Sequence, residues 1–188
     1  MIKILVLYYS NHGSIAKMAN LIARGIESIE NCEAIIRTVD SDDDQNQNVP
    51  LATLNDLQTC DALALGSPSY FGNMAAPLKK FIDQLTDIWL SGKTIGKPAT
   101  VFSSTGSLHG GQETTLISMM LPLFHLGFIL IGVPYSEINL LNTTTGGTPY
   151  GATHVAGIKN NQSISNAEKQ ICLTVGKRLA NLAKNLNK

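Results

Sequence analysis

Hydroxyl, amide and glycine residues follow three apolar stretches of this chain, and such residues are suited to binding phosphate. The stretch Leu5–Ile15 reads LVLYYSNHGSI, in which an apolar run ends at Ser10, passes one glycine and enters a helical pattern. A strand that ends in this way directs N–H groups, hydroxyls and the positive end of a helix to one spot. The same arrangement recurs where GSPSYFGN follows Ala62–Leu65 and where SSTGSLHGG follows Ala99–Phe102. We therefore expect a phosphate-bearing ligand at a rim built from three strand ends.

Hydrophobic periodicity predicts the elements that carry these loops. Apolar runs predict strands at Ile2–Tyr9, Glu33–Val39, Asp61–Gly66, Lys97–Ser103 and Phe128–Val133. Helical spacing predicts helices at Ser14–Ile29, Leu51–Leu57, Pro77–Leu90, Gln112–Leu126 and Ser165–Leu186. Ser14 is expected to cap its helix, and Pro122 to kink or break the helix that contains it. Asp40–Asn48 is expected to be a surface loop, and Pro134–Asn160 a long irregular segment with a functional or interface role.

The alternation of strands and helices predicts an α/β fold. We expect one domain over residues 1–188, a three-layer, doubly wound, five-stranded parallel sheet of the flavodoxin-like order 2-1-3-4-5. In that order, successive strands are added on opposite sides of strand 1, so the switch point of the sheet lies between strands 1 and 3. The three polar loops then surround one crevice, which is where such sheets bind ligands.

Composition restricts the partners and the compartment. The formal net charge is zero and 15% of residues are charged, which argues against nucleic acid and is typical of chains that form oligomers. The three cysteines have no metal-site spacing, so we expect no bound metal and a reducing, cytoplasmic setting. No apolar run reaches the ~18 residues of a membrane span.

The residues at the rim favour FMN over other phosphate ligands. The first loop has no lysine, which a Walker A motif requires, and it contains only Gly13 of the glycines of a dinucleotide-binding fingerprint. Ser10 and Ser67 occupy the positions where a phosphorylated receiver domain has acidic residues. One phosphate site beside two wide loops fits a mononucleotide with a flat ring. Ser10, Asn11, Gly13 and Ser14 would hold the phosphate, with His12 able to contact it. Loops Pro68–Asn73 and Ser104–Gly110 would clasp the ring, with Tyr70 and Phe71 as a wall.

The chain resembles the tryptophan-repressor-binding-protein type of NAD(P)H:quinone oxidoreductases in four stretches, LVLYYSNHGSI, GSPSYFGNM, VFSSTGSLHGGQE and GGTPYGA. The resemblance covers about residues 1–157. It implies FMN bound through Ser10 to Ile15, Ser69 to Phe71 and Ser104 to Gly110, with His125 beside the flavin. It also implies that Trp89 borders the substrate pocket and that Tyr135 lies near it. The family's enzymes are typically tetramers whose active sites include residues of a neighbouring subunit.

Residues and resemblance together give a full candidate site. The expected catalytic residues are His125, Trp89 and Tyr135. The expected FMN-binding residues are Ser10, Asn11, His12, Gly13, Ser14, Ile15, Pro68, Ser69, Tyr70, Phe71, Gly72, Asn73, Ser104, Thr105, Gly106, Ser107, Leu108, His109, Gly110 and His125.

The chain departs from the resembled family at two of these loops. The family loop T-R-F is Ser69-Tyr70-Phe71 here, so the arginine is absent and recognition of the nicotinamide donor is in question. The third loop is one residue longer than SSTGTGGGQE, which brings His109 near the flavin rim. The segment before the third strand is shortened near Asp42–Asn48.

The expected activity is two-electron, ping-pong hydride transfer from NAD(P)H through FMN to a quinone, by a homo-oligomer. The absence of paired carboxylates in the three loops is consistent with chemistry carried by a cofactor. The first alternative is a flavodoxin-like one-electron carrier, although such carriers tend to be acidic and this chain is neutral. The second is a binding protein that keeps the fold without turnover.

Overall fold

A parallel sheet forms the centre of the molecule in the computed structural model, which describes residues 1–40 and 48–187. The strands are β1 (Ile2–Tyr8), β2 (Cys32–Thr38), β3 (Ala62–Tyr70), β4 (Asn73–Met74), β5 (Pro98–Thr105), β6 (Ile129–Leu130) and β7 (Ala152–Val155). The main order is β2-β1-β3-β5-β6, with β4 paired antiparallel to β3 and β7 parallel to β5. The predicted flavodoxin-like α/β fold and strand order are confirmed.

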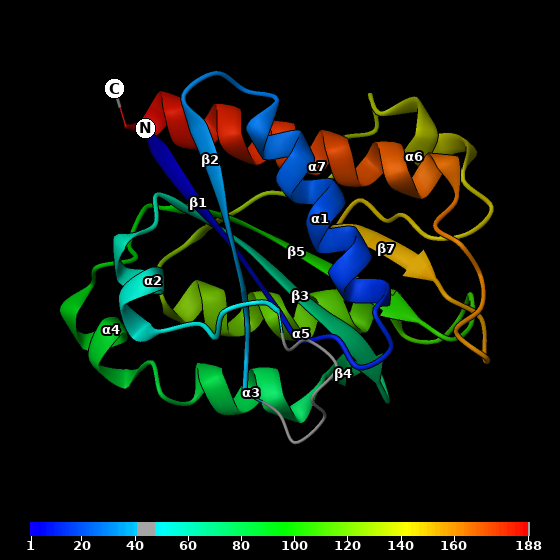
Figure 1. The fold of residues 1–188 in the computed structure, drawn as a ribbon, viewed down its shortest axis with the longest axis horizontal. Coiled ribbons are helices and arrows are strands. Elements are labelled where there is room, and N and C mark those ends of the chain that lie inside the picture. Colours follow the sequence, from blue (N-terminus) through cyan, green and yellow to red (C-terminus); the bar gives the residue numbers. More distant parts are fainter. Residues whose placement is uncertain (41–47, 188) are drawn as a thin grey trace.

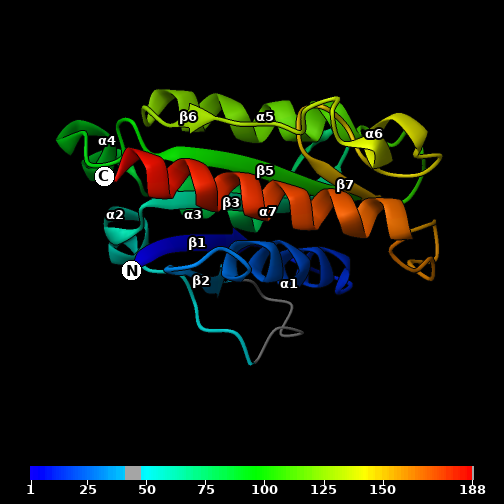
Figure 2. The ribbon, with the colours of Figure 1, turned by 90° about the horizontal axis from the view of Figure 1, so that it is seen from above.

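Helices cover both faces of this sheet, as Figures 1 and 2 show. The helices are α1 (Ser14–Glu27), α2 (Leu54–Thr59), α3 (Ala76–Ile82), α4 (Thr86–Ser91), α5 (Gln112–His125), α6 (Ile138–Asn142) and α7 (Asn166–Leu186). Helices α1 and α7 pack side by side on one face, and α6 packs against α7. Helices α3, α4 and α5 contribute to the core on the other face.

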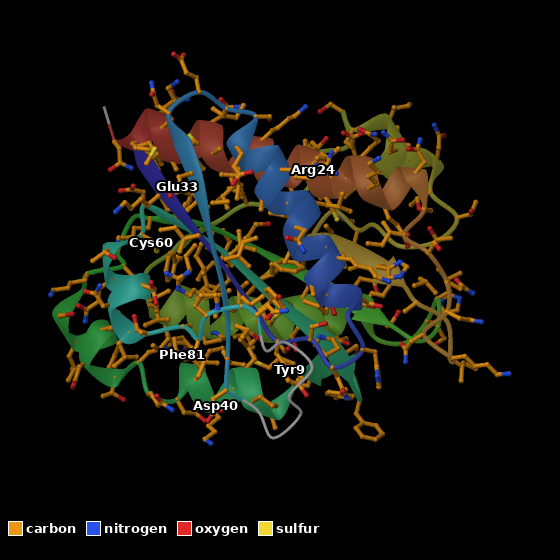
Figure 3. All side chains as sticks on the ribbon, viewed as in Figure 1. Tyr9, Arg24, Glu33, Asp40, Cys60 and Phe81 are labelled. Atoms are coloured by element: carbon orange, nitrogen blue, oxygen red, sulfur yellow. The ribbon has the colours of Figure 1, made fainter. Side chains whose placement is uncertain are left out.

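Two apolar cores result, one on each face of the sheet. The face under α1 and α7 buries an apolar stripe of α1 that includes Ile15, Met18 and Ile22, the helical spacing from which this helix is predicted. The opposite core includes Tyr9, Cys60 and Phe81, which are labelled in Figure 3. Each core keeps its helices in place, so the loops at the strand ends start from a rigid base.

Two glycines allow α1 and α7 to approach closely. A Cβ built on Gly25 would lie 2.3 Å from the Leu173 carbonyl oxygen, and one on Gly176 would lie 2.2 Å from the Ile22 carbonyl oxygen. Only hydrogen fits at these positions, so backbone packs directly on backbone at this crossing. The N-terminus of α1 is thereby fixed relative to α7.

The last strand position differs from the prediction. Of the expected strand Phe128–Val133 only β6 forms, pairing with the start of β5, while β7 pairs with its end. The expected irregular segment Pro134–Asn160 contains α6 and β7. After β6, Ile131 N–H still donates to the Ala99 carbonyl of β5 at 2.8 Å, whereas Val133 N–H donates to the Pro149 carbonyl at 2.9 Å, so the chain has turned away from β5 by Val133. The fifth sheet position is therefore filled in two pieces.

Several boundaries also differ. The expected helix Pro77–Leu90 is divided into α3 and α4, and α5 continues through Pro122 to His125. Gly13, not Ser14, is the N-cap of α1. Residues 41–47 of the expected acidic loop lie outside the described residues. Within residues 1–40 and 48–187, none of the helices combines the length and apolar character that a membrane crossing requires.

Candidate functional site

A cavity of about 190 Å³ opens where β1, β3, β5 and β7 end. We call it the strand-end cavity. Its lining residues are Ser10, Asn11, His12, Ser14, Ile15, Pro68, Ser69, Tyr70, Ser104, Thr105, Gly106, Gly157, Ile158 and Asn160. The structure thus brings residues from all three predicted loops to one place. None of these lining residues is acidic, which favours an anionic or neutral ligand.

The N-terminus of α1 supplies donors to this cavity. Gly13 caps the helix in the left-handed region, with φ of 84°, a conformation that favours glycine. Because the N-cap residue is a glycine, it supplies no side-chain hydrogen bond to the helix, and the first turn contains no acidic residue. Ser10 Oγ accepts a hydrogen bond from Ala16 N–H at 3.3 Å, which folds the loop over the helix end. The N–H groups of Ser14 and Ile15 have no partner within the helix and suit a phosphate.

The loops after β3 and β5 are joined to each other beside the cavity. Ser69 Oγ donates to the Gly110 carbonyl at 3.0 Å and accepts from Thr115 Oγ1 at 2.8 Å. A Cβ on Gly111, whose φ is 87°, would lie 2.8 Å from Gly72 Cα. The two loops are therefore fixed relative to each other beside the cavity, an arrangement that suits a flat ring bound between them.

Asn11 and Tyr70 connect the first loop to the second. Asn11 Nδ2 donates to the Tyr70 hydroxyl at 3.0 Å. This bond holds the Tyr70 ring at the cavity, where it is 40% exposed. The predicted aromatic wall is thus represented in the lining by Tyr70.

Several predicted residues lie beside the cavity rather than in its lining. They are Gly13, Phe71, Gly72, Asn73, Ser107, Leu108, His109 and Gly110. His109 and Leu108 are exposed at the loop surface. Phe71 is fully exposed at the tip of the β3–β4 hairpin. A ligand reaching out of the cavity could contact these residues, whereas the cavity itself does not enclose them.

The three predicted catalytic residues lie away from the strand-end cavity of their own chain. His125 ends α5 near the start of β5, where Ile129 N–H donates to the Lys97 carbonyl at 2.9 Å. His125 therefore lies at the amino ends of the strands, because α5 begins beside their carboxyl ends and runs back along the sheet. His125 and Trp89 together line a second groove of about 260 Å³, mostly apolar, between α3, α4 and α5. Tyr135 is exposed before α6 and lines neither cavity. Within one chain, His125 therefore does not lie beside the cavity that contains loop Ser10–Ile15.

The residues that sequence reasoning missed are Gly157, Ile158 and Asn160. They follow β7 and form a wall of the strand-end cavity. The available signal was the polar, glycine-containing run GIKNNQ, which has the same character as the three recognised loops. It was missed because β7 was not recognised as a strand.

The three cysteine thiols do not suit nucleophilic or redox chemistry. Burial raises the pKa of Cys60 to about 11 and raises the pKa values of Cys32 and Cys172 above the ordinary value of a thiol. Neutral thiols are poor nucleophiles. None of the three lines the strand-end cavity. The cysteines therefore do not supply the chemistry of this site.

Comparison with known proteins gives one family and a consistent fold. The model of the family described as NADPH-dependent FMN reductase matches residues 2–139. A WrbA-like flavodoxin from Agrobacterium tumefaciens superposes with a TM-score of 0.71 and 24% identity, over 98% of this chain and 99% of that chain. A flavodoxin from the domain Archaea gives a TM-score of 0.67 and 21% identity, over 97% of this chain and 99% of that chain. A flavone reductase gives 0.70 and 12% identity, over 99% of this chain and 64% of that chain.

Proposed function

The chain belongs to the NADPH-dependent FMN reductase family, and from this premise we propose that it is an FMN-dependent NAD(P)H:quinone oxidoreductase. FMN is its cofactor, as the family and the flavodoxin-like fold indicate. Family membership supports a nicotinamide as the electron donor. The quinone as acceptor rests on the resemblance of the four strand-end and loop motifs to quinone oxidoreductases.

One observation carries the proposal: the N-terminus of α1, which has no acidic residue in its first turn, opens into a cavity without acidic residues, beside two linked loops. The N–H groups of Ser14 and Ile15, with the hydroxyls of Ser10 and Ser14, are a donor set for a phosphate monoester. The loops after β3 and β5 contribute Pro68, Ser69, Tyr70, Ser104, Thr105 and Gly106 to the same cavity, so that their backbone groups and the Tyr70 ring are available to a flat ring system. These residues fit FMN.

The roles of the protein in this reaction are binding and orientation. FMN, when bound, supplies hydride and two-electron chemistry. The α1 N-terminus would hold the phosphate, and the joined loops at Ser69 and Gly110 would hold the ring. The exposed rim at Phe71 leaves one side open for the nicotinamide and the quinone to enter in turn.

The direct test is the absorbance of purified protein after addition of FMN and removal of free flavin. Anaerobic NADH or NADPH should bleach the bound flavin, and benzoquinone should restore it. Bound FMN that neither nicotinamide bleaches would favour the electron carrier. Failure to retain FMN would contradict both functions.

Phe71 gives a prediction in which stability and turnover change in opposite directions. Phe71 and Gly72 have φ of 53° and 75° in the two-residue connection between β3 and β4, where Asn-Gly is the preferred pair. A left-handed phenylalanine costs about 1–2 kcal/mol, and this side chain is fully exposed. Such strain at a site rim is typical of functional residues.

We therefore expect Phe71→Asn to raise the free energy of unfolding by about 1 kcal/mol, and to raise Tm by about 2 to 4 °C. The loss of an aromatic contact to the substrate ring should lower kcat/KM for benzoquinone about fivefold. Thermal melts and steady-state kinetics measure the two effects. Phe71→Tyr, which keeps both the ring and the strain, should match the parent protein; a destabilised F71N would show that the ring packs in the folded chain.

Trp89 and His125 act, in this proposal, on the flavin of a neighbouring copy. They share a groove at the opposite sheet edge, and Trp89 is 53% exposed. Light scattering should give a multiple of the 20.2 kDa chain mass. Trp89→Ala should lower kcat/KM for benzoquinone about tenfold, the free energy of one aromatic contact, and leave FMN affinity unchanged. A fully active monomer would rule out this role.

A further inference from the structure

A single buried carboxylate holds both ends of one wall of the strand-end cavity. The wall is formed by the loop of residues 156–164, which we call the wall loop; its Gly157, Ile158 and Asn160 line the cavity. Glu168 Oε1 accepts from Val155 N–H, just before the loop, at 3.1 Å. Glu168 Oε2 accepts from Ser165 N–H, just after the loop, at 2.7 Å. The carboxylate therefore closes the loop at its base.

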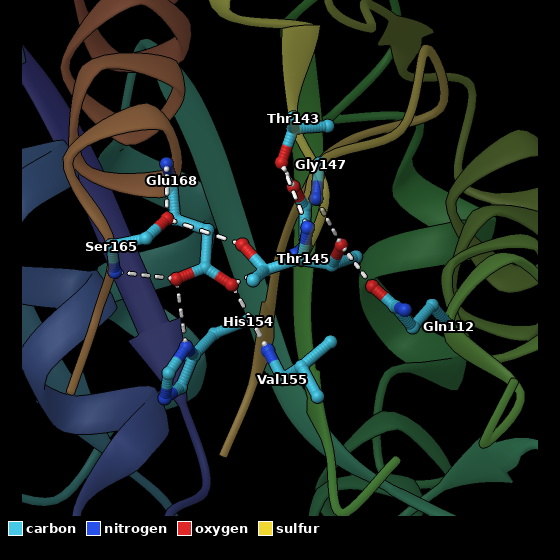
Figure 4. A network of polar contacts seen from close by, with 10 residues as sticks. Gln112, Thr143, Thr145, Gly147, His154, Val155, Ser165 and Glu168 are labelled. Carbon is cyan, nitrogen blue, oxygen red and sulfur yellow. Dashed lines mark hydrogen bonds and ion pairs between the residues drawn. The ribbon is translucent and has the colours of Figure 1, made fainter. Parts of the chain in front are cut away.

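The same carboxylate is held in place by two more donors, as Figure 4 shows for His154. His154 Nδ1 lies 3.0 Å from Oε2, and Gly146 N–H donates to Oε1 at 2.8 Å. Glu168 is 1% exposed and is the third residue of α7, where the positive end of the helix favours an anion. Four hydrogen bonds thus fix its orientation.

The charge of this carboxylate is stable at neutral pH. Burial raises the pKa of Glu168, but the hydrogen bonds from His154, Ser165, Val155 and Gly146 outweigh burial and hold the pKa at about 2. The groups that face it are the His154 ring and the buried Cys172 thiol, which is neutral. A buried carboxylate with this many donors is a rigid connection between α7, β7 and the wall loop.

The wall loop has a small number of other supports among the described residues, one of which is Ile164, packed against the core under α1 and α7. Ala156 N–H donates to the Thr105 carbonyl at 2.8 Å, and Gln162 N–H to the Ala156 carbonyl at 3.0 Å. Residues 158–163 are exposed. The exposed middle of the loop is therefore held from its two ends, and the residues that flank those ends, Val155 and Ser165, both bind Glu168.

We propose that Glu168 is a positioning residue for the cofactor, which it affects by setting the place of the wall loop against the strand-end cavity. The inference rests on the proposed function, because it takes FMN as the occupant of that cavity. Glu168 itself lines no part of the cavity. Its effect on FMN must pass through Val155, Ser165 and the loop between them.

Glu137 provides a matched control. Its carboxylate also joins the segment between β6 and β7 to α7, accepting from Asn139 N–H at 3.1 Å and from Thr174 Oγ1 at 2.6 Å. It binds no residue of the wall loop and lines no part of the cavity. Glu168→Gln and Glu137→Gln each remove one carboxylate charge that accepts hydrogen bonds between α7 and the segment before it. Only E168Q places an amide N–H₂ group against the N–H donors at the base of the wall loop.

The experiment titrates FMN into each purified apoprotein at a temperature where circular dichroism shows it fully folded. Under that condition a general loss of stability leaves Kd unchanged. We expect E168Q to bind FMN about tenfold more weakly, the effect of one hydrogen bond to a charged group, and to alter the visible circular dichroism of bound FMN. E137Q should stay within about twofold of the parent protein.

Hydrogen exchange on the parent protein supplies a second measurement in case E168Q does not fold. FMN should protect the amides of residues 156–164 from exchange. Equal Kd values and spectra for E168Q and the parent, or no protection of the wall loop, would overturn the role of Glu168 alone. A parent protein that binds no FMN would overturn this role and the proposed function together.

Discussion

Replacing Ser14 by aspartate should make the apoprotein more stable and nearly abolish FMN binding. Ser14 is the first residue of α1, and the helix has no acidic residue in its first turn. An aspartate there interacts favourably with the helix dipole by about 0.3–1 kcal/mol. The same carboxylate would stand at the strand-end cavity, where we place the FMN phosphate. Two unit charges about 4 Å apart repel by about 4 kcal/mol at an effective dielectric constant of 20, which corresponds to about a 1000-fold rise in Kd.

Two controls separate charge from shape in this experiment. Ser14→Asn introduces a side chain of the same size as aspartate but without its charge. It should weaken FMN binding less than about tenfold, the cost of one hydroxyl hydrogen bond. Riboflavin, which lacks the phosphate, should bind S14D and the parent protein alike. Fluorescence titration gives the affinities and thermal melts of the apoproteins give the stabilities. Similar FMN affinity for S14D and S14N would mean that the phosphate does not bind at α1.

The parts of the site that the sequence predicted are those with a local cause. The run from Leu5 to Ile15 contains the end of a strand, a turn glycine and the start of a helix, and each is visible within a few residues. The two other loops repeat that pattern, and parallel strands bring their carboxyl ends to one edge. The strand-end cavity accordingly includes residues of all three loops.

The fourth wall was missed because its causes lie far away in the sequence. Strand β7 reads ATHV, and the polar Thr153 and His154 are fully buried in it. Thr153 donates to Gln112 Oε1, and His154 contacts Glu168. Such partners on other elements make a polar residue acceptable in a buried strand, and no local propensity contains them.

The location of His125 could have been derived from element lengths alone. Helix α5 has 14 residues, which at 1.5 Å per residue is ~20 Å. A helix of that length that begins at the carboxyl ends of the strands must finish near their amino ends. His125 at its last residue therefore cannot lie beside loop Ser10–Ile15 of the same chain. The resemblance of motifs identified His125 as a candidate, whereas the length of α5 places it at the amino ends of the strands.

Acid should destabilise the protein through Glu168 in a defined pH range. Its pKa is held at about 2 in the folded chain, below the ordinary glutamate value of 4.5. The unfolded chain therefore binds more protons in this range, and stability falls as pH falls. The contribution of Glu168 is fully present above about pH 4.5 and is lost between that value and about 2. A difference of about 2.5 pKa units corresponds to about 3 kcal/mol of unfolding free energy.

Urea unfolding of the apoprotein from pH 6 to pH 3, followed by circular dichroism, measures this contribution. The E168Q protein should be less stable than the parent at pH 6, and the gap should narrow as pH falls, because protonation removes the same charge from the parent. E137Q should also narrow its gap, but by less, since the pKa of Glu137 is lowered by fewer donors. If the gap between parent and E168Q stayed constant with pH, the buried carboxylate would contribute by shape alone, and its charge would not be what holds the base of the wall loop.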